Sequence, residues 1–284
     1  MRQGKGIQYL FLIFAAIVVV LTALIFLFLA TGLGLFFSDG YSPLAFFTGT
    51  SWNPHSGLYG ILPLLVGSFA VAALTLLISA PLALLVSLYI VEVAPDAIQR
   101  PMRTVIDLMA ALPSVIYGLL ALTIVVPWVR VTFNAPLGKG ILPAVIVLIF
   151  MVQPTMVAVA EDALRNVPRE TKEGSYGLGA TRWQTITGVM IPSARRGLIS
   201  AVILGLGRAV GETMAVQMVI GNVATQIPKN LVTGAATMPS QIVTEWAEAT
   251  SQIHKDALIM VGFVLLVITM GLIIVARRTG ARTA

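Results

Sequence analysis

Long uninterrupted apolar stretches recur along this chain of 284 residues. Each runs to about 18 residues or more with few charges, which is long enough to cross a hydrocarbon core of roughly 30 Å as a helix. Hydrophobic residues make up 57% of the chain and charged residues 11%, against roughly 45–50% and 25% in an ordinary soluble domain. A transmembrane β-barrel alternates lipid-facing and lumen-facing residues and has no such runs. The chain is therefore expected to be an all-α membrane protein.

Hydropathy predicts a single transmembrane domain over residues 1–284, with spans at about 7–36, 61–90, 105–129, 140–160, 197–220 and 257–276. The first span follows the basic residues Arg2 and Lys5, an order that secretory signals share. This span is much longer than the 7–15 residue core of a signal peptide, and no A-x-A-like cleavage site ends it. We therefore interpret it as a retained membrane helix.

The distribution of basic residues predicts the orientation, because lysine and arginine favour cytoplasmic loops. With six spans, both termini lie on one side of the membrane. Thirteen basic residues share that side: Arg2, Lys5, Arg100, Arg103, Arg165, Arg169, Lys172, Arg182, Arg195, Arg196, Arg277, Arg278 and Arg282. Four lie on the other side, namely Arg130, Lys139, Lys229 and Lys255, and Arg208 lies within a span. Both termini are therefore expected in the cytoplasm, and the net charge of +6 reflects topology rather than nucleic-acid binding.

Metal and cofactor sites are not expected in this chain. It has no cysteine, and its two histidines, His55 and His254, stand in different polar segments. Neither has a second histidine at the spacing that metal ligands need. Surface histidines are the simpler interpretation.

The most polar segment runs from Glu161 to Arg196, between the fourth and fifth predicted spans. Connections between bundle helices usually have only about 2–8 residues. Pro168 suits the first turn of a short helix that Gly177 or Gly179 can end, and Thr181 can cap a second short helix that Pro192 stops. We expect a compact cytoplasmic knob suited to docking, with a plain solvated linker as the alternative.

Within this loop the spacing resembles the EAA loop of ABC-importer permeases, E-A-A followed by three residues, G, nine residues and I-x-L-P. Glu173, Gly174 and Ser175 stand at the first three positions, and Gly179 and Pro192 match the glycine and the proline. Val189 and Ile191 replace the isoleucine and the leucine. The resemblance implies a coupling helix that inserts into an ATPase, with the coupling residues Glu173, Gly174, Ser175, Gly179, Ala180 and Thr181. No phosphate-binding pattern G-x-x-x-x-G-K-S/T occurs in the chain, so ATP hydrolysis is expected on a separate subunit and this chain is not expected to be an enzyme.

Two charged residues, Arg208 and Glu212, lie inside the fifth predicted span. A central arginine costs roughly 2.5–3.5 kcal/mol even on the lenient scale, and such residues usually face the bundle interior or a water-filled cavity. Four residues apart on a helix, the two would share one face and reach each other, together with Ala201, Leu204 and Ala215. One interpretation is an ion pair that only fixes helix packing. The other is a substrate pathway in which the arginine attracts an anion through its planar fork and the glutamate limits the affinity.

The run GLGRAVGETMAVQMVIGN around this pair resembles the PstC-type permeases of bacterial phosphate importers, as do LMAALPSVIYGLLAL at 108–122 and ILPAVIVLIFMVQPTM at 141–156. The resemblance implies a six-transmembrane-helix ABC importer permease of type I, MetI-like, that translocates inorganic phosphate across the cytoplasmic (inner) membrane. The implied partners are a PstA-like permease, PstB-like ATPase subunits and a PstS-like periplasmic phosphate-binding protein. Three alternatives remain open: a permease for sulfate, molybdate or phosphonate, an ATP-independent channel or secondary transporter, and a sensory membrane protein.

Overall fold

Helices make up nearly all of the computed structural model, which describes residues 3–38 and 40–282. The helices are α1 (Gln3–Ser38), α2 (Pro43–Thr48), α3 (Leu62–Leu88), α4 (Asp96–Ala111), α5 (Ser114–Leu120), α6 (Val126–Thr132), α7 (Ile141–Arg165), α8 (Arg169–Gly177), α9 (Arg182–Thr185), α10 (Ile191–Gly211), α11 (Met214–Ile220), α12 (Met238–Trp246) and α13 (Gln252–Arg282). π-Helical turns at Tyr89–Val93, Ala121–Val125 and Ile186–Met190 continue α3, α5 and α9. A short antiparallel pair joins β1 (Trp52–Asn53) to β2 (Leu58–Tyr59).

Six of the described helical segments are long and apolar enough to cross a membrane. They are Gln8–Ser38, Leu62–Val93, Ser114–Thr132, Ile141–Arg165, Arg182–Gly211 and Gln252–Arg278. The predicted all-α membrane fold with six spans is therefore confirmed.

The third and fifth segments differ from the predicted ranges. The third begins at Ser114 rather than near residue 105, because α4 is a separate amphipathic helix that ends at Ala111. Leu112 and Pro113 are extended between the two helices, with ψ of 129° and 143°, as the residue before a proline tends to be. The fifth segment runs over Arg182–Gly211 rather than 197–220.

The centre of the bundle is α7, which packs against both α3 and α10. Leu148, Met151 and Met156 of α7 are fully buried. Helix α10 approaches closely at Gly205, where an added Cβ would lie 2.5 Å from the Met156 sulfur. Small residues at such crossings let membrane helices pack backbone to backbone.

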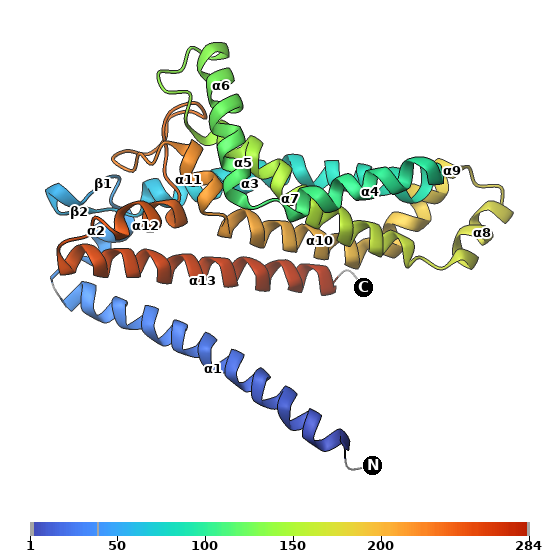
Figure 1. Cartoon of the computed structure of the whole chain (residues 1–284), viewed down its shortest axis with the longest axis horizontal. Coiled ribbons are helices and arrows are strands. Elements are labelled where there is room, and N and C mark those ends of the chain that lie inside the picture. Colours follow the sequence, from blue (N-terminus) through green and yellow to red (C-terminus); the bar gives the residue numbers. More distant parts are fainter. Residues whose placement is uncertain (1–2, 39, 283–284) are drawn as a thin grey trace.

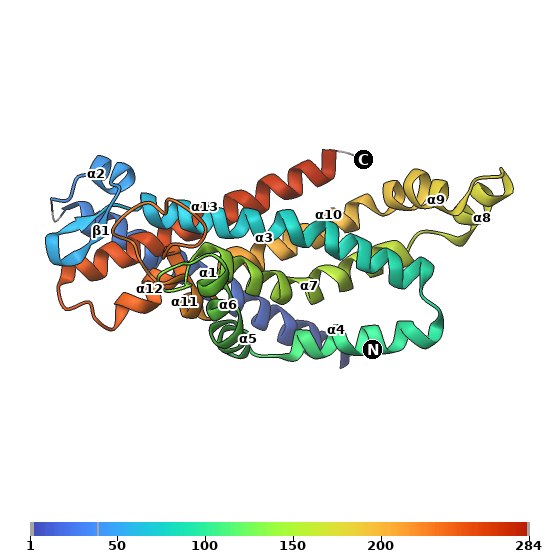
Figure 2. The same cartoon turned by 90° about the horizontal axis from the view of Figure 1, so that it is seen from above.

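The two ends of the bundle differ in structure (Figure 1). One end, here called the loop end, carries α8 and α9. The other, the hairpin end, carries α2, the β1–β2 pair and α12, and the views from the side and from above agree on this arrangement (Figure 2). The Phe46 and Tyr59 rings each pack against Phe36 in T-shaped contacts at the hairpin end, with ring centroids 5.3 and 6.0 Å from that of Phe36.

Helix α1 leaves the bundle along most of its length (Figure 1). It contacts α13 near the hairpin end, where Gly32 lies against Ile259. Between Tyr9 and Phe28 its large apolar side chains are exposed. This surface is suited to lipid or to another membrane subunit.

Candidate functional site

The fifth span is broken at Glu212. Helix α10 ends at Gly211, Glu212 has an extended backbone with φ −69° and ψ 127°, and α11 begins at Met214. The expectation of one continuous helix through residue 220 is therefore wrong. Four-residue spacing places two side chains on one face only while the helix continues.

Arg208 lies in the last turn of α10 and is half-buried. Its Nη1 atom donates a hydrogen bond to Thr155 Oγ1 of α7 at 3.2 Å. The ion pairs found among residues 3–38 and 40–282 involve other residues, so no described carboxylate neutralises Arg208. The predicted contact between Arg208 and Glu212 is thus absent from the described chain.

Glu212 takes a different role. Its Oε1 atom accepts a hydrogen bond from the Ala215 backbone N–H at 3.3 Å, at the start of α11. A carboxylate is stabilised at such a position because the first N–H groups of a helix have no helical partner. The five residues that were expected to share one helix face do not share it. Ala201 and Ala215 are buried, while Leu204 is 49% exposed.

These contacts leave Arg208 as a cation in a spanning helix with one neutral hydrogen-bond partner. A guanidinium has five donors, and a single hydroxyl satisfies only one of them. The remaining donors are available to an anion with paired oxygens. Thr155 could not be singled out from the sequence, although a polar residue directly after Pro154 within a span is a usable signal.

The polar loop is shorter than the predicted range 161–196, because α7 extends to Arg165 and α10 begins at Ile191. Helix α8 starts directly after Pro168, as expected. Gly179 has φ +82°, a left-handed conformation that glycine adopts without a steric penalty. The chain can therefore reverse direction between α8 and α9.

Thr181 begins the second short helix through a capping box, as predicted. The Gln184 N–H donates to Thr181 Oγ1 at 3.3 Å, and Gln184 Oε1 accepts from the Thr181 N–H at 2.8 Å. Pro192 does not stop the helix, contrary to expectation, because a π-helical turn carries α9 directly into α10. Pro192 stands just after this π-helical turn, inside a continuous helical segment.

The predicted coupling residues surround the tip of this loop. Glu173 and Gly174 are exposed on α8, and Ser175 lies 3.0 Å from the Thr185 hydroxyl of α9. Ala180 is half-buried just before the exposed Thr181. These residues form one exposed surface over α8 and α9.

Sequence reasoning missed three apolar side chains on the same tip. Leu178 is 92% exposed, Trp183 68% and Tyr176 42%. Large apolar side chains in a polar loop are the signal that could have found them, since such residues exposed to water mark contact surfaces. Helix α8 is also tied to the end of α3, where Lys172 Nζ lies 2.6 Å from Glu92 Oε1.

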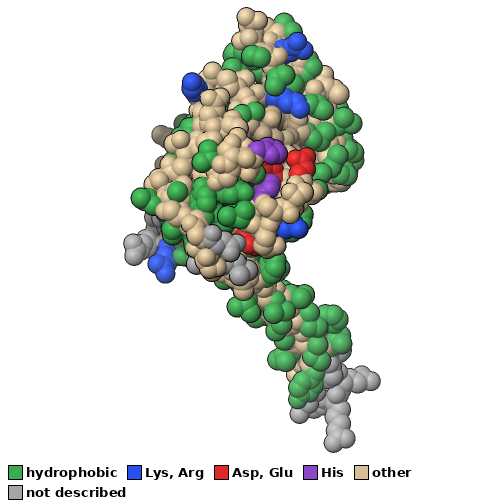
Figure 3. Space-filling view, turned by 90° about the vertical axis from the view of Figure 1, so that its left-hand side faces the viewer, with side chains coloured by type: hydrophobic (Ala, Val, Ile, Leu, Met, Phe, Trp, Pro, Cys, Tyr) green, Lys and Arg blue, Asp and Glu red, His purple; other side chains and the backbone are tan. Residues whose placement is uncertain are grey.

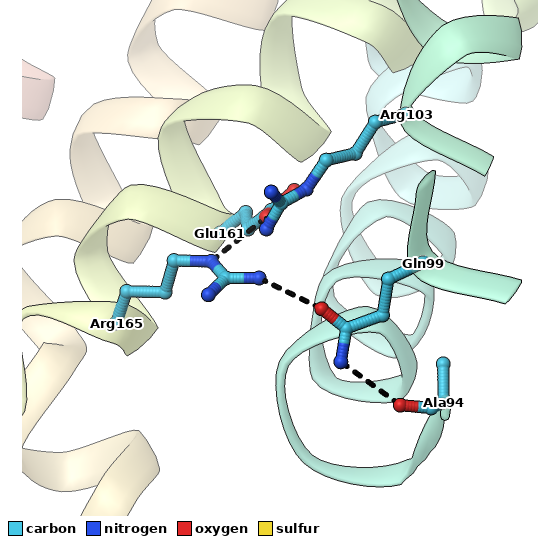
Figure 4. A network of polar contacts seen from close by, with 5 residues as sticks. All are labelled: Ala94, Gln99, Arg103, Glu161 and Arg165. Carbon is cyan, nitrogen blue, oxygen red and sulfur yellow. Dashed lines mark hydrogen bonds and ion pairs between the residues drawn. The ribbon is translucent and has the colours of Figure 1, made fainter. Parts of the chain in front are cut away.

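A second charged network joins α4 to α7 at the loop end (Figure 4). Glu161 of α7 forms ion pairs with Arg103 of α4 and with Arg165, whose Nε lies 2.9 Å from Glu161 Oε1. Arg165 also donates to Gln99 Oε1 at 3.3 Å, and Gln99 donates to the Ala94 carbonyl at 2.9 Å. The network holds the amphipathic helix against the bundle.

Comparison with known proteins agrees with this fold. Residues 79–283 match the family described as "Binding-protein-dependent transport system inner membrane component". The probable ABC transporter permease protein YqgH of Bacillus subtilis is 39% identical over 254 residues, covering 88% of this chain and 82% of the relative. The phosphate transport system permease protein PstC of Pasteurella multocida is 34% identical over 288 residues, covering 95% and 86%. PstC of Xylella fastidiosa (strain 9a5c) is 35% identical over 253 residues, covering 82% and 78%.

Solved structures share the fold at lower sequence identity. A bacterial alginate ABC transporter, solved with a periplasmic protein bound to an alginate pentasaccharide, contains a chain with a TM-score of 0.67 and 17% identity, covering 99% of this chain and 98% of that one. The inward-facing MetNI methionine ABC transporter contains one with a TM-score of 0.60 and 20% identity, covering 82% and 99%. The architecture is that of MetI-like ABC importer permeases, and a permease subunit is not itself an enzyme. The chain therefore belongs to the family of binding-protein-dependent transport system inner membrane components.

Proposed function

We propose that this protein is the membrane-spanning subunit of an ATP-driven importer of inorganic phosphate. The observation that carries the proposal is Arg208, a guanidinium within a spanning helix whose recorded hydrogen bond is to the Thr155 hydroxyl. Phosphate offers the paired oxygens that this group binds through two parallel hydrogen bonds. Relatives named phosphate transport system permeases cover most of the chain, which supports phosphate over other oxyanions.

In this proposal Arg208 and Glu212 both lie on the substrate pathway but have different roles. Arg208 lowers the energy of an anion that crosses the low-dielectric bundle. Glu212 holds the start of α11 in place and so fixes the break directly after the arginine. A single arginine on the pathway suits a pore that passes the anion, whereas a tight binding site would surround the anion with charged donors.

The loop end faces the cytoplasm in this proposal, with both termini on the same side. Arg165, Arg169, Lys172 and Arg182 lie on or beside α8 and α9, in agreement with the excess of basic residues in cytoplasmic loops. The hairpin end then faces the compartment from which substrate arrives. The protein is accordingly a multi-pass component of the cytoplasmic membrane.

The coupling surface at the tip of the loop docks on a separate ATPase subunit of the PstB type. This surface includes the predicted coupling residues Glu173, Gly174, Ser175, Gly179, Ala180 and Thr181, of which Glu173, Ser175 and Thr181 have polar side chains. Leu178 and Trp183 supply the apolar side chains that a docking surface buries. A PstA-like permease completes the pore beside this chain, and the exposed apolar surface of α1 and the bundle is suited to that contact. A PstS-like periplasmic protein delivers phosphate at the hairpin end.

The proposal is tested by co-expressing the chain with its candidate permease, ATPase and binding-protein partners and reconstituting the purified complex in vesicles. Phosphate-loaded binding protein should stimulate ATP hydrolysis and drive phosphate uptake. Uptake of sulfate or molybdate in place of phosphate would contradict the substrate, and uptake without ATP would contradict the ATP-driven mechanism.

A matched pair of variants on α8 tests the coupling surface. Glu173→Ala is expected to abolish the stimulation of ATP hydrolysis, because it removes an exposed carboxylate from that surface. Glu170→Ala removes the same group from an exposed position one turn earlier on the helix and should leave it nearly unchanged. Equal stimulation in Glu173→Ala and the unmodified protein would contradict the coupling role.

A further inference from the structure

A polar cavity of about 510 Å³ opens at the hairpin end, away from Arg208 and the loop. Its walls come from four segments: the hairpin, the chain after α11, helix α12 and the start of α13. The lining residues that carry the argument below are Asn222, Gln241, Glu245, Glu248 and His254. Figure 3 shows this end of the molecule, where the two histidines lie beside acidic side chains.

Glu245 is held rigidly in the wall of this cavity. Its Oε2 atom accepts from Trp52 Nε1 at 2.8 Å and lies 2.9 Å from His254 Nε2. Both recorded contacts fall on one oxygen, so within the described chain Oε1 has no recorded partner and remains available to a ligand. The three residues tie the hairpin, α12 and α13 together, which preorganises the carboxylate.

Two further oxygen acceptors in the wall lack partners. The Asn222 Nδ2 group donates to the Gln217 carbonyl at 3.0 Å, which fixes the direction of the amide, and its buried Oδ1 has no hydrogen-bond partner among the described residues. Gln241 is only 3% exposed, and its Oε1 atom likewise has no partner in the described chain. A buried acceptor without a donor costs about 1–3 kcal/mol. Both oxygens are enclosed, so they add negative potential to the wall without contacting a ligand in the open cavity.

The charged residues that line the cavity indicate whether its ligand is a cation or an anion. Glu245 and Glu248 line it together with His55 and His254, and its lining within the described residues includes no lysine or arginine. Glu245 faces His254 Nε2, so Glu248 is the carboxylate of this lining without an ion-pair partner among the described residues. Acceptors and carboxylates repel a phosphate anion and attract an ammonium or a guanidinium. No group of three or more metal-ligating side chains occurs in the described part of the chain, which argues against a metal ion as the occupant.

We infer that this cavity receives a lysine or arginine side chain of the periplasmic binding protein when that protein docks on the hairpin end. The inference rests on the proposed function, which brings a binding protein to this end. Charge complementarity identifies the occupant, and the lining residues His55 and Glu248 are exposed, so a side chain can enter from outside. The contact would fix the orientation of the delivered protein, since paired charges across an interface set register and specificity.

The test uses the whole reconstituted transporter and measures ATP hydrolysis as a function of the concentration of phosphate-loaded binding protein. Glu248→Lys places a like charge in the cavity, so the half-saturating concentration should rise at least about tenfold while the maximal rate stays unchanged. Glu248 is exposed and has no side-chain hydrogen bond in the described structure, so the variant should fold. Ser56→Lys is the control for an added lysine, because it places the same side chain at an exposed residue of this end that does not line the cavity, with a charge change of +1 against +2 for Glu248→Lys.

A charge exchange identifies the partner residue. Each exposed lysine or arginine of the binding protein is changed to glutamate, and one such variant should restore half-saturation with Glu248→Lys while weakening it with the unmodified transporter. Equal half-saturation for Glu248→Lys, Ser56→Lys and the unmodified chain would refute the docking contact while the proposed function stands. An unmodified complex in which no binding protein stimulates ATP hydrolysis would instead refute the proposed function itself.

Discussion

Replacing Arg208 by glutamine removes the positive charge from the proposed pathway while keeping a polar side chain of similar reach. The size of the expected loss in phosphate uptake follows from the surroundings of Arg208. Its described hydrogen-bond partner is the neutral Thr155 hydroxyl, so its full charge is available to the substrate. At about 4 Å and an effective dielectric constant of about 20, one pair of unit charges interacts by about 4 kcal/mol. Losing that term at the energy maximum would slow passage about 10³-fold.

The measurement is uptake of radiolabelled phosphate into vesicles that contain the reconstituted complex, at saturating ATP and binding protein. Assembly of the variant complex is checked by co-purification of the ATPase subunit. Arg208→Lys keeps the charge but loses the planar fork, so its uptake should fall only about tenfold, the loss of one charge-assisted hydrogen bond. Arg130→Gln, an identical change at an exposed arginine of α6, should leave uptake within about twofold because surface charges are strongly screened.

One result would refute the electrostatic role of Arg208. If Arg208→Gln assembles normally and imports phosphate within tenfold of the unmodified complex, the arginine contributes packing and not a field. A deficit equal in Arg208→Gln and Arg208→Lys would point to geometry instead of charge.

Three further predictions concern positions around this site. Thr155→Val removes the hydroxyl that orients Arg208 and should lower phosphate uptake several-fold, whereas Thr155→Ser should restore it in the same vesicle assay. Glu161→Gln breaks a network with two half-exposed arginines and should lower the free energy of unfolding in detergent by about 1–2 kcal/mol, with Glu170→Gln as an exposed control that changes little. Burial raises the pKa of Tyr59, aided by the nearby Glu245 carboxylate and opposed by a hydrogen bond with Ser251. Since the neutral phenol is favoured in the folded state, stability should be complete below about pH 10 and decline above it, and Tyr59→Phe should remove part of that decline in thermal unfolding measured from pH 8 to 11.

Hydropathy was sufficient to predict how many helices span the membrane, because a stretch of about twenty apolar residues is long enough to cross it and rarely forms anything else. Local capping chemistry was sufficient for Thr181, whose partner Gln184 is three residues away. Both features are determined by residues that are close together in the sequence, so they can be predicted without knowing how the rest of the chain packs.

The break after Gly211 could not be predicted from helical spacing. No proline marks it, and the carboxylate that would have paired with Arg208 instead caps α11. Pro192 was equally ambiguous, because a proline ends one helix or opens the next depending on what precedes it.

The polar cavity at the hairpin end escaped prediction for a different reason. Trp52 and Glu245 are 193 residues apart in sequence. Only the packing of the hairpin against α12 and α13 brings them together, and no local pattern contains that information.

The break at Glu212 also divides the fifth span into two helices that can move separately. From Arg182 to Gly211 the chain is continuously helical over 30 residues, with a π-helical turn at Ile186–Met190, and spans roughly 45 Å at about 1.5 Å per residue. Arg208 stands near one end of this segment and the coupling surface near the other, while α11 beyond the break is packed separately against α5 and α7. A tilt of about 5° at the loop end therefore moves the guanidinium by about 3 Å over that length, which is enough to break its hydrogen bond to Thr155. In the proposed importer, a movement of the coupling surface would therefore shift Arg208 without carrying α11 with it.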